Sequence, residues 1–502
     1  MRNSDSLYRL IHSLTKSEKR QFKIYTSLQA GNKMYIKLFD LIEKQMQYDE
    51  KELKSELKIK AFPVAKIYLY DLILKSLRLQ EHRDNKKKLV LDLLENAENL
   101  LKKGFYDQSY KELIKAKKIA QKIQQFCLLI EIKQLEHAIA NTSLNTNRLK
   151  ELYKEGNEEF YSSLSALKEQ FEYRKAINLI TYRRSERGKT LRNKNEKRDI
   201  ENKIVELLNK NPEECLSFKA RIFHYNLNEL FYFSNNNFQE AYNQSKKAID
   251  YFESNPFMLT QEIGNYINSM NNLMNSLMAM KKYEEMMHYI QKMNQFTIDP
   301  ATERARIFAF AASRQIIYYT FTNQHQKGIE FISGIENEIS KYESILNHPV
   351  FFALCCNLEE FYFVFGNFKK ALYWNNRMLN HSEIKLYYDF YSNARISEII
   401  IHYELENTDI NESLVKSYQS FLKKNPSNGK FESACLHFFK QITGSIILQK
   451  RKQIFIDFLT ELKELSTNSY ETEVFDIFDI QSWLQSKIDG RAFSEVLLES
   501  NK

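Results

Sequence analysis

The amino-acid sequence predicts an all-α protein made of stacked helix pairs, and three observations carry this prediction. The chain has 502 residues but only 11 Gly and 6 Pro, and it is rich in Lys, Leu, Ile, Glu and Asn, a composition typical of long helices. A pattern of an aromatic residue followed by small residues recurs about every 43 residues. Prolines recur at nearly the same interval, so both signals indicate repeated helical units.

The repeated pattern is clearest between Asn237 and Pro256, where Phe238 is followed by Ala241 and, seven residues later, by Ala248. Its first position is held by Tyr106, Phe238, Tyr283, His325 and Phe368, its second by Ser109, Ala241, Met286, Gly328 and Ala371, and its third by Ala116, Ala248, Met293, Ile335 and Met378. Small side chains let two helices approach closely, so each unit is predicted to be a helix pair.

Further units follow from the spacing of the first position. Its later copies lie 45, 42 and 43 residues apart, and the earliest copy precedes them by 132 residues, or three times 44. Two less obvious units are therefore expected in between, with helices that begin near Asn147 and Lys197. Additional helix starts are expected near Asn411 and Lys452, which brings the total to about nine antiparallel pairs.

The prolines mark the boundaries between units. Pro212, Pro256, Pro300, Pro349 and Pro426 all fall between predicted pairs, because proline stops one helix and suits the first turn of the next. After the second of these, apolar residues recur at helical spacing: Ile263, Tyr266, Ile267, Met270, Leu273, Met274 and Leu277. One pair cannot bury such a face by itself, so successive pairs must stack.

Residues 1–88 are predicted to form a basic helical region of their own. Five helices are expected there: one to Leu14, one from Thr15 or Ser17, one around 34–42 after a break at Ala30-Gly31-Asn32, one over 49–60, and one over 64–83 after Pro63. The region is interpreted as an N-terminal cap on the first repeat, and the alternative is a helix-turn-helix that binds nucleic acid.

The repeat array is assigned to residues 89–466 and a C-terminal capping region to residues 467–502. Within the latter, the stretch 470–488 is rich in apolar residues: Val474, Phe475, Ile477, Phe478 and Trp483. An array needs its last apolar face covered, so these residues are expected to close it.

In two units a glycine precedes the aromatic position by two residues: Gly104 before Tyr106, and Gly366 before Phe368. With the small residues at plus three and plus ten, this spacing resembles the tetratricopeptide-repeat superfamily over about three quarters of the chain. The period here is about 43 rather than 34 residues, which also suits HEAT-like or armadillo-like pairs. The resemblance implies a right-handed α-solenoid that acts as a non-catalytic scaffold and holds a peptide or protein partner in its groove.

The distribution of charge and the use of cysteine indicate the cellular compartment in which the protein is expected. Residues 1–88 carry 20 Lys and Arg against 11 Asp and Glu, which is +9, and the remaining 53 basic and 53 acidic residues cancel. The five cysteines form no C-x-x-C pair, and the sequence has neither a signal peptide nor an apolar run of about 18 residues. A cytoplasmic protein without a membrane partner is therefore expected.

No catalytic motif supports an enzyme. The sequence lacks the phosphate-binding, dinucleotide-binding, zinc-protease and nucleophile-elbow patterns, and its ten histidines are isolated from one another. No cofactor or metal site is predicted. The adjacent thiols Cys355 and Cys356 are interpreted as core residues, and the adjacent carboxylates Glu359 and Glu360 as ordinary solvated charge.

The segment 183–198 is the first candidate partner-binding site. It contains Arg183, Arg184, Arg187, Lys189, Arg192, Lys194, Lys197 and Arg198, against only Glu186 and Glu196. Arginine binds phosphates and carboxylates through two parallel hydrogen bonds, so nucleic acid or an acidic protein segment would fit. The alternative is a solvated turn whose cations suit the C-terminus of the preceding helix.

An asparagine row is the second candidate site. Asn265, Asn268, Asn272 and Asn275 are spaced 3, 4 and 3 residues apart, so they share one face of a helix. Side-chain amides both donate and accept hydrogen bonds, so such a row can hold an extended peptide backbone. The alternative is a solvated face in an asparagine-rich protein.

Two functions follow as expectations. The first is a scaffold that binds a protein or peptide. The second is a regulator whose basic N-terminal helices bind DNA or RNA while the repeats sense a partner, by analogy with peptide-sensing bacterial regulators. Lys66, Lys75, Arg78 and Arg83 discriminate between them, because a shared exposed face would favour nucleic acid and burial against the first repeat would favour a cap.

Overall fold

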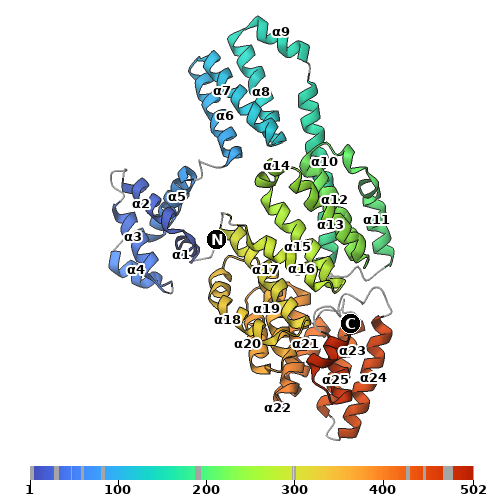
Figure 1. Cartoon of the computed structure of the whole chain (residues 1–502). Coiled ribbons are helices and arrows are strands. Elements are labelled where there is room, and N and C mark those ends of the chain that lie inside the picture. The colour runs from blue at the N-terminus through green and yellow to red at the C-terminus, as the bar shows by residue number, and fades with distance from the viewer. Residues whose placement is uncertain are drawn as a thin grey trace. The chain divides into compact units, whose positions relative to one another are not determined.

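The computed structural model describes residues 5–27, 33–46, 48–57, 61–80, 85–155, 157–186, 194–296, 298, 301–424, 430–444, 448–466 and 479–500. These residues form 26 α-helices and two short 3-10 helices and contain no β-strand (Figure 1), which confirms the all-α class. The chain divides into two compact units, Met1–Leu167 and Lys168–Lys502. The boundary lies within the long helix α10 (Glu158–Glu186).

The first unit begins with five helices, as predicted. They are α1 (Ser6–Ser13), α2 (Lys16–Ser27), α3 (Lys33–Lys44), α4 (Glu50–Leu57) and α5 (Phe62–Gln80); the predicted break at 30–32 lies outside the described residues. At the start of α2 the Glu18 amide donates to Thr15 Oγ1 (3.2 Å) and the Thr15 amide donates to Glu18 Oε2 (2.6 Å), a capping box that fixes where the helix begins. Pro63 lies in the first turn of α5, where its missing N–H is tolerated.

These five helices share one apolar core. It contains Leu7, Ile11, Leu14, Phe22, Leu38, Phe39, Ile42, Leu53, Phe62, Ala65, Leu69, Leu72 and Ile73. The rings of Phe22 and Phe39 stack with their centroids 4.5 Å apart, and α5 packs against both α2 and α3. The packing leaves the outer face of α2 toward solvent, where Ile24 is 44% exposed.

The first unit continues with helices that each pack on the next one in sequence. They are α6 (Lys86–Lys102), α7 (Tyr106–Lys122), α8 (Phe126–Ser143) and α9 (Thr146–Glu155). Helix α9 begins one residue before the predicted start near Asn147. Ser109, a small residue of the repeated pattern, is fully buried and its hydroxyl donates to the Ala97 carbonyl of α6 (2.6 Å), so this position joins the two helices of a pair.

The second unit contains a series of helices that follow one another along the chain. They are α11 (Lys194–Asn209), α12 (Phe218–Ser234), α13 (Phe238–Glu253), α14 (Pro256–Gln261), α15 (Ile263–Ala279), α16 (Tyr283–Asn294), α17 (Ala301–Phe321), α18 (His325–Tyr342), α19 (His348–Val364), α20 (Phe368–Leu379), α21 (Tyr388–Glu404), α22 (Thr408–Lys424), α23 (Lys430–Gly444) and α24 (Leu448–Ser466). The 3-10 helices are Pro212–Glu214 and Ile384–Leu386. Helix α11 begins three residues before the predicted start near Lys197. The apolar residues predicted to recur at helical spacing after Pro256 lie on α15, which the short helix α14 precedes.

We call α12, α15, α17, α19 and α21 the first helices, and α13, α16, α18, α20 and α22 the second helices of their pairs. The first position of the repeated pattern is the first residue of a second helix in α13, α16, α18 and α20. Its second position is fully buried at Ala241, Met286 and Ala371. These second positions therefore face the core, and each second helix packs on the first helix that follows or on its own partner.

One turn geometry joins the first and second helices throughout. The residue two positions before each second helix has a left-handed backbone: Asn236 (φ 58°), Lys281 (58°), Asn323 (55°), Gly366 (75°) and Glu406 (60°), and Gly104 (79°) is its counterpart before α7. The next amide closes the turn by a hydrogen bond back into the first helix, as from Asn237 N–H to the Tyr232 carbonyl (2.9 Å). This is the Schellman arrangement, and it explains why glycine suits the position without being required there.

Replacing Glu406 with glycine is expected to stabilise the second unit by about 0.5–1 kcal/mol, because the left-handed conformation strains a side chain with a Cβ atom. Glu412→Gly on the exposed face of α22 is the matched control, and it should destabilise by about 1 kcal/mol. Both Trp residues, Trp374 and Trp483, lie in the second unit and are 1% exposed, so tryptophan fluorescence during urea unfolding measures this difference. Equal destabilisation by both substitutions would contradict it.

The C-terminal helices α25 (Ile480–Asp489) and α26 (Phe493–Ser500) contact turns far back in the sequence. Trp483 Nε1 donates to Glu404 Oε1 (2.6 Å), Phe493 packs against Phe363 (5.7 Å between centroids), and Lys281 Nζ donates to the Ser500 carbonyl (2.6 Å). Of the residues predicted to cap the array, Trp483 is thus in the core, and those at 474–478 lie outside the described residues.

Candidate functional site

The asparagine row lies on α15, and its four side chains, Asn265, Asn268, Asn272 and Asn275, are all half-buried. At one end Asn265 Nδ2 donates to Glu262 Oε2 (2.8 Å), and that carboxylate also pairs with Lys219 Nζ of α12 (2.7 Å). Asn268 makes no hydrogen bond within the described part of the chain. Its amide is therefore available to a partner, whereas the Asn265 amide is already engaged.

The other two asparagines of the row join α15 to the neighbouring first helices. Asn272 Nδ2 donates to Glu229 Oε2 of α12 (2.9 Å), and Asn275 Oδ1 accepts a hydrogen bond from Arg314 Nη2 of α17. Arg314 Nη2 also lies 3.5 Å from Asn271 Oδ1. The row therefore lies on the surface where three consecutive first helices meet.

These contacts repeat with the period of the sequence. The pairs Ser269–Asn226, Asn272–Glu229 and Arg314–Asn271 each join residues 43 positions apart. Equivalent positions of successive units thus touch, as expected when identical units stack without slipping. Part of the asparagine row is consequently used for stacking, and all four of its side chains keep partial exposure to solvent.

Arg314 is electrostatically unusual among the arginines of this surface. Its side chain is half-buried, this burial lowers its pKa to about 10, and no carboxylate of the described residues offsets that effect. Its Nε atom has no hydrogen-bond partner within the described residues, and its Nη2 meets only neutral amide oxygens. By contrast, Arg306 of the same helix pairs with Glu303 (2.5 Å) and Arg395 of α21 with Glu398 (2.6 Å).

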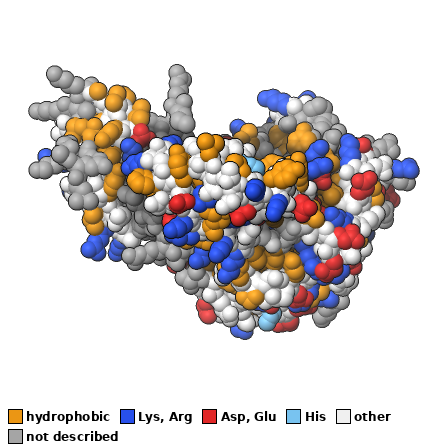
Figure 2. Space-filling view, turned by 90° about the horizontal axis from the view of Figure 1, so that it is seen from above, with side chains coloured by type: hydrophobic (Ala, Val, Ile, Leu, Met, Phe, Trp, Pro, Cys, Tyr) orange, Lys and Arg blue, Asp and Glu red, His pale blue; other side chains and the backbone are white. Residues whose placement is uncertain are grey.

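The basic segment 183–198 falls largely outside the described residues. Arg183 and Arg184 lie in the last turn of α10, whereas Arg187 and Arg192 lie outside the described residues. The hypothesis that these four arginines bind nucleic acid or an acidic protein segment stays a prediction. On the face shown in Figure 2, Lys and Arg side chains are interspersed with Asp and Glu, in keeping with the neutral charge balance beyond residue 88.

The adjacent carboxylates Glu359 and Glu360 correct an expectation. They are expected to be solvated, but Glu359 is only 5% exposed and Glu360 is half-buried. Burial raises the pKa of both groups to about 8. The reason is that α19 packs against α17, α20 and α21 and so lacks a wide solvent face. Cys355, four residues earlier, is fully buried as predicted.

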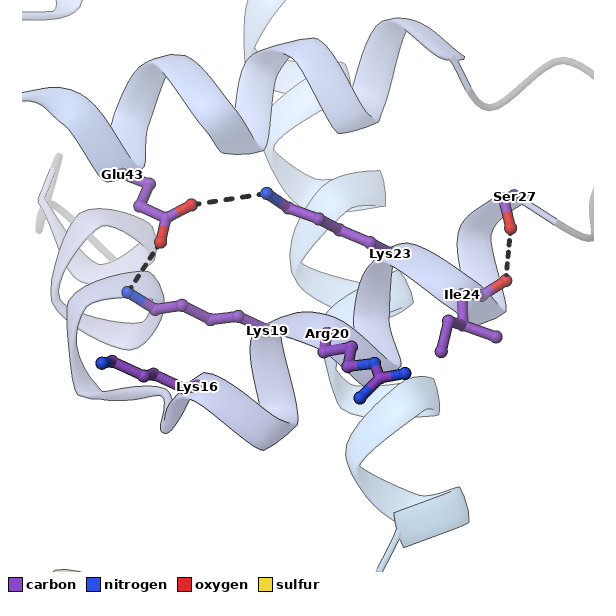
Figure 3. A pocket seen from close by; sticks show the side chains of 7 residues that line it. All are labelled: Lys16, Lys19, Arg20, Lys23, Ile24, Ser27 and Glu43. Carbon is purple, nitrogen blue, oxygen red and sulfur yellow. Dashed lines mark hydrogen bonds and ion pairs between the residues drawn. The ribbon is translucent and has the colours of Figure 1, made fainter.

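A cationic groove on α2 was not identified from the sequence as a site. It has a volume of about 500 Å³ and is lined by Lys16, Lys19, Arg20, Lys23, Ile24, Ser27 and Glu43. Figure 3 shows Glu43 between Lys19 and Lys23, with ion-pair distances of 3.0 and 3.7 Å. Lys23 also pairs with Asp40 (2.7 Å). The basic residues at positions 16, 19, 20 and 23 are spaced three to four residues apart, as on one face of a helix. This spacing is the sequence signal that would have revealed the groove.

The residues proposed to discriminate between a cap and a nucleic-acid-binding helix are only partly described, and of these Lys66 is engaged in an ion pair. Lys66 pairs with Glu50 of α4 (2.7 Å), and that carboxylate also pairs with Lys54, which holds the pKa of Glu50 at about 2. Lys75 and Arg78 are exposed on α5, and Arg83 lies outside the described residues. The exposed cations of this region that line a groove are instead on α2.

Neither a scan against family models nor a search of curated proteins finds a match for this chain. None of the described helices combines the length and the apolar run needed to cross a bilayer. Within the described residues, no three His, Cys, Asp or Glu side chains gather as metal ligands. The features that point to a function are therefore the surface formed by Arg314 with the asparagine row, and the α2 groove.

Proposed function

We propose that this chain is a non-catalytic, cytoplasmic scaffold that binds an extended segment of a protein or peptide partner. In this proposal the repeats form a right-handed, tetratricopeptide-like solenoid of about nine antiparallel pairs, and residues 1–88 form its N-terminal helical region. Support comes from the shared turn geometry and from the contacts between units 43 residues apart. Five free cysteines suit a reducing compartment.

The observation that carries the proposal is the missing counter-charge of Arg314. A desolvated cation is unfavourable unless an anion or good hydrogen-bond acceptors replace the lost water. Among the described residues, Arg314 has amide acceptors from Asn271 and Asn275 but no carboxylate. A carboxylate of the partner, from an acidic side chain or a C-terminus, would complete the site, because guanidinium and carboxylate form strong charge-assisted hydrogen bonds.

The asparagine row supplies the second part of the site. Each side-chain amide offers one acceptor oxygen and two donor hydrogens. The Asn268 amide has no hydrogen bond within the described part of the chain, and it lies on the same face of α15 as Asn275, which contacts Arg314. The row would bind the backbone of a segment whose carboxylate meets Arg314, so the proposed partner is extended and acidic at one position.

Replacing Arg314 with methionine is expected to weaken partner binding without lowering the stability of the fold. The variant should keep or gain about 1–2 kcal/mol of stability, because a desolvated charge is replaced by an apolar side chain of similar length. It should lose most partner binding, because the carboxylate of the partner has no counter-charge. The measurement is affinity capture from the native cell with nuclease treatment, followed by mass spectrometry, together with urea unfolding.

Arg174→Met is the matched control, because it removes the same charge from an exposed position on α10. It should capture the same proteins as the unmodified chain. Proteins captured equally by the Arg314→Met variant would show that the partner does not use this site. A marked loss of stability in that variant would show that Arg314 is a structural residue.

A further inference from the structure

The α2 groove lies in the first unit and takes no part in the proposed scaffold site. Its four cations lie on consecutive turns of a single helix: Lys16, Lys19, Arg20 and Lys23. Helix α2 packs its opposite face, through Phe22 and Thr26, into the N-terminal core. The cations are thus presented by a packed helix, and their direction is fixed by its position.

Two of these four cations lack a counter-charge. The carboxylates of Glu43 and Asp40 on α3 pair with Lys19 (3.0 Å) and Lys23 (2.7 Å) and hold both side chains in place. Lys16 and Arg20 are exposed and make no ion pair within the described residues (Figure 3). Hydrogen bonding to Asp40 raises the pKa of Lys23, so the groove keeps its positive charge across the physiological range.

We infer that the α2 groove binds the phosphate backbone of a nucleic acid. Lys16 and Lys23 are seven residues apart, which is about 10.5 Å along a helix, and this length matches about three successive phosphates of one strand. Lys16 and Arg20 would bind phosphates directly, while Lys19 and Lys23, already oriented by Glu43, would add hydrogen bonds at the inner side. Ile24, 44% exposed, gives the groove an apolar wall against which sugar rings pack.

The charge distribution favours nucleic acid over an acidic peptide. Residues 1–88 carry the entire net charge of +9, and a field of this extent attracts a polyanion more strongly than a segment with a few carboxylates. A peptide also needs pockets for its other side chains, and the groove has one apolar side chain, Ile24, among its lining residues. The contacts are to phosphates, so the expected binding is weakly dependent on base sequence.

The test is fluorescence anisotropy with the full chain, a labelled 20-base-pair DNA duplex, a labelled 20-nucleotide RNA and a labelled ten-residue polyglutamate peptide, at 50–300 mM salt. The duplex or the RNA should bind with an affinity that falls steeply with salt. The double variant Lys16→Gln and Arg20→Gln should bind about tenfold more weakly at low salt, and its log–log salt slope should be smaller by about 2.

A variant with the same charge loss, Lys423→Gln and Lys424→Gln on the exposed end of α22, should bind within about twofold of the unmodified chain. Equal weakening by both double variants would overturn the inference, because the effect would then come from net charge alone. Binding of polyglutamate without binding of either nucleic acid would also overturn it. The Arg314→Met variant should bind nucleic acid normally, which keeps this test independent of the scaffold proposal.

Discussion

The second unit is expected to lose stability as the pH rises from about 5 to 8, by on the order of 3 kcal/mol. The groups responsible are Glu359 and Glu360 of α19, whose pKa values burial raises to about 8. In the unfolded chain a glutamate has a pKa of about 4.3. Between these values the folded state holds protons that the unfolded state has released, so each rise in pH favours unfolding.

Replacing Glu359 with glutamine should remove much of this pH dependence. The amide keeps the shape of the protonated carboxyl and can still accept the hydrogen bond that the Ser397 hydroxyl gives to Glu359. Asp479 and Glu359 both raise the pKa of Glu360 through repulsion, so the single variant should also make Glu360 easier to ionise. The measurement is urea unfolding by tryptophan fluorescence at pH 5.5, 7.0 and 8.5.

Comparing the variants at each pH separates the contribution of the carboxylates to the pH dependence of stability from that of the histidines. Burial lowers the pKa of His224 and His402, so these groups destabilise the fold as the pH falls below about 6.5. That contribution cancels when the unmodified chain is compared with Glu359→Gln at each pH. Glu338→Gln, on the exposed face of α18, should leave the pH profile unchanged. A Glu359→Gln difference that is constant across pH would contradict the prediction.

Replacing Gly328 with alanine is expected to destabilise the second unit by roughly 2–3 kcal/mol. A Cβ atom at this position of α18 would lie 2.3 Å from Cε2 and 2.4 Å from Cζ of Phe361. The Phe361 ring is fully buried in the largest core of the unit, so it cannot move aside without disturbing its neighbours. The clash therefore weakens the packing between α18 and α19.

Gly334→Ala in the same helix is the control for this prediction. Apart from the adjacent residues and the backbone of its own helix, no atom lies within 4 Å of the Cβ that would be added there. Alanine should therefore stabilise the helix by about 1 kcal/mol through its better helix propensity. Urea unfolding followed by tryptophan fluorescence gives both values. Similar effects of the two substitutions would mean that Phe361 relaxes and that the close contact is not required.

Local sequence patterns predicted much of this architecture. The first position of the repeated pattern marks where second helices begin at Phe238, Tyr283, His325 and Phe368, because these positions depend on turn geometry and on small residues nearby in the chain. The five N-terminal helices follow in the same way from caps such as Thr15 and Glu18. Helical periodicity and capping act over a few residues, so they are visible in a single sequence.

The candidate sites were less predictable, since they depend on residues distant in the chain. The row at 265–275 was visible as a spacing, but its use in stacking requires Glu229 and Arg314, each about 40 residues away. The cations of α2 belong to the basic region predicted at residues 1–88. The sequence does not show which of them form ion pairs, because the partners Asp40 and Glu43 lie on another helix.

By itself, the sequence determined the helical class, the period of about 43 residues and the small residues that let paired helices meet. Only the tertiary structure decided the charge states. It buried Glu359 and, as far as the described residues show, left Arg314 without a carboxylate and Lys16 and Arg20 without an ion partner. The physical reason is that helix formation depends on neighbours in the chain, whereas desolvation and charge pairing depend on neighbours in space.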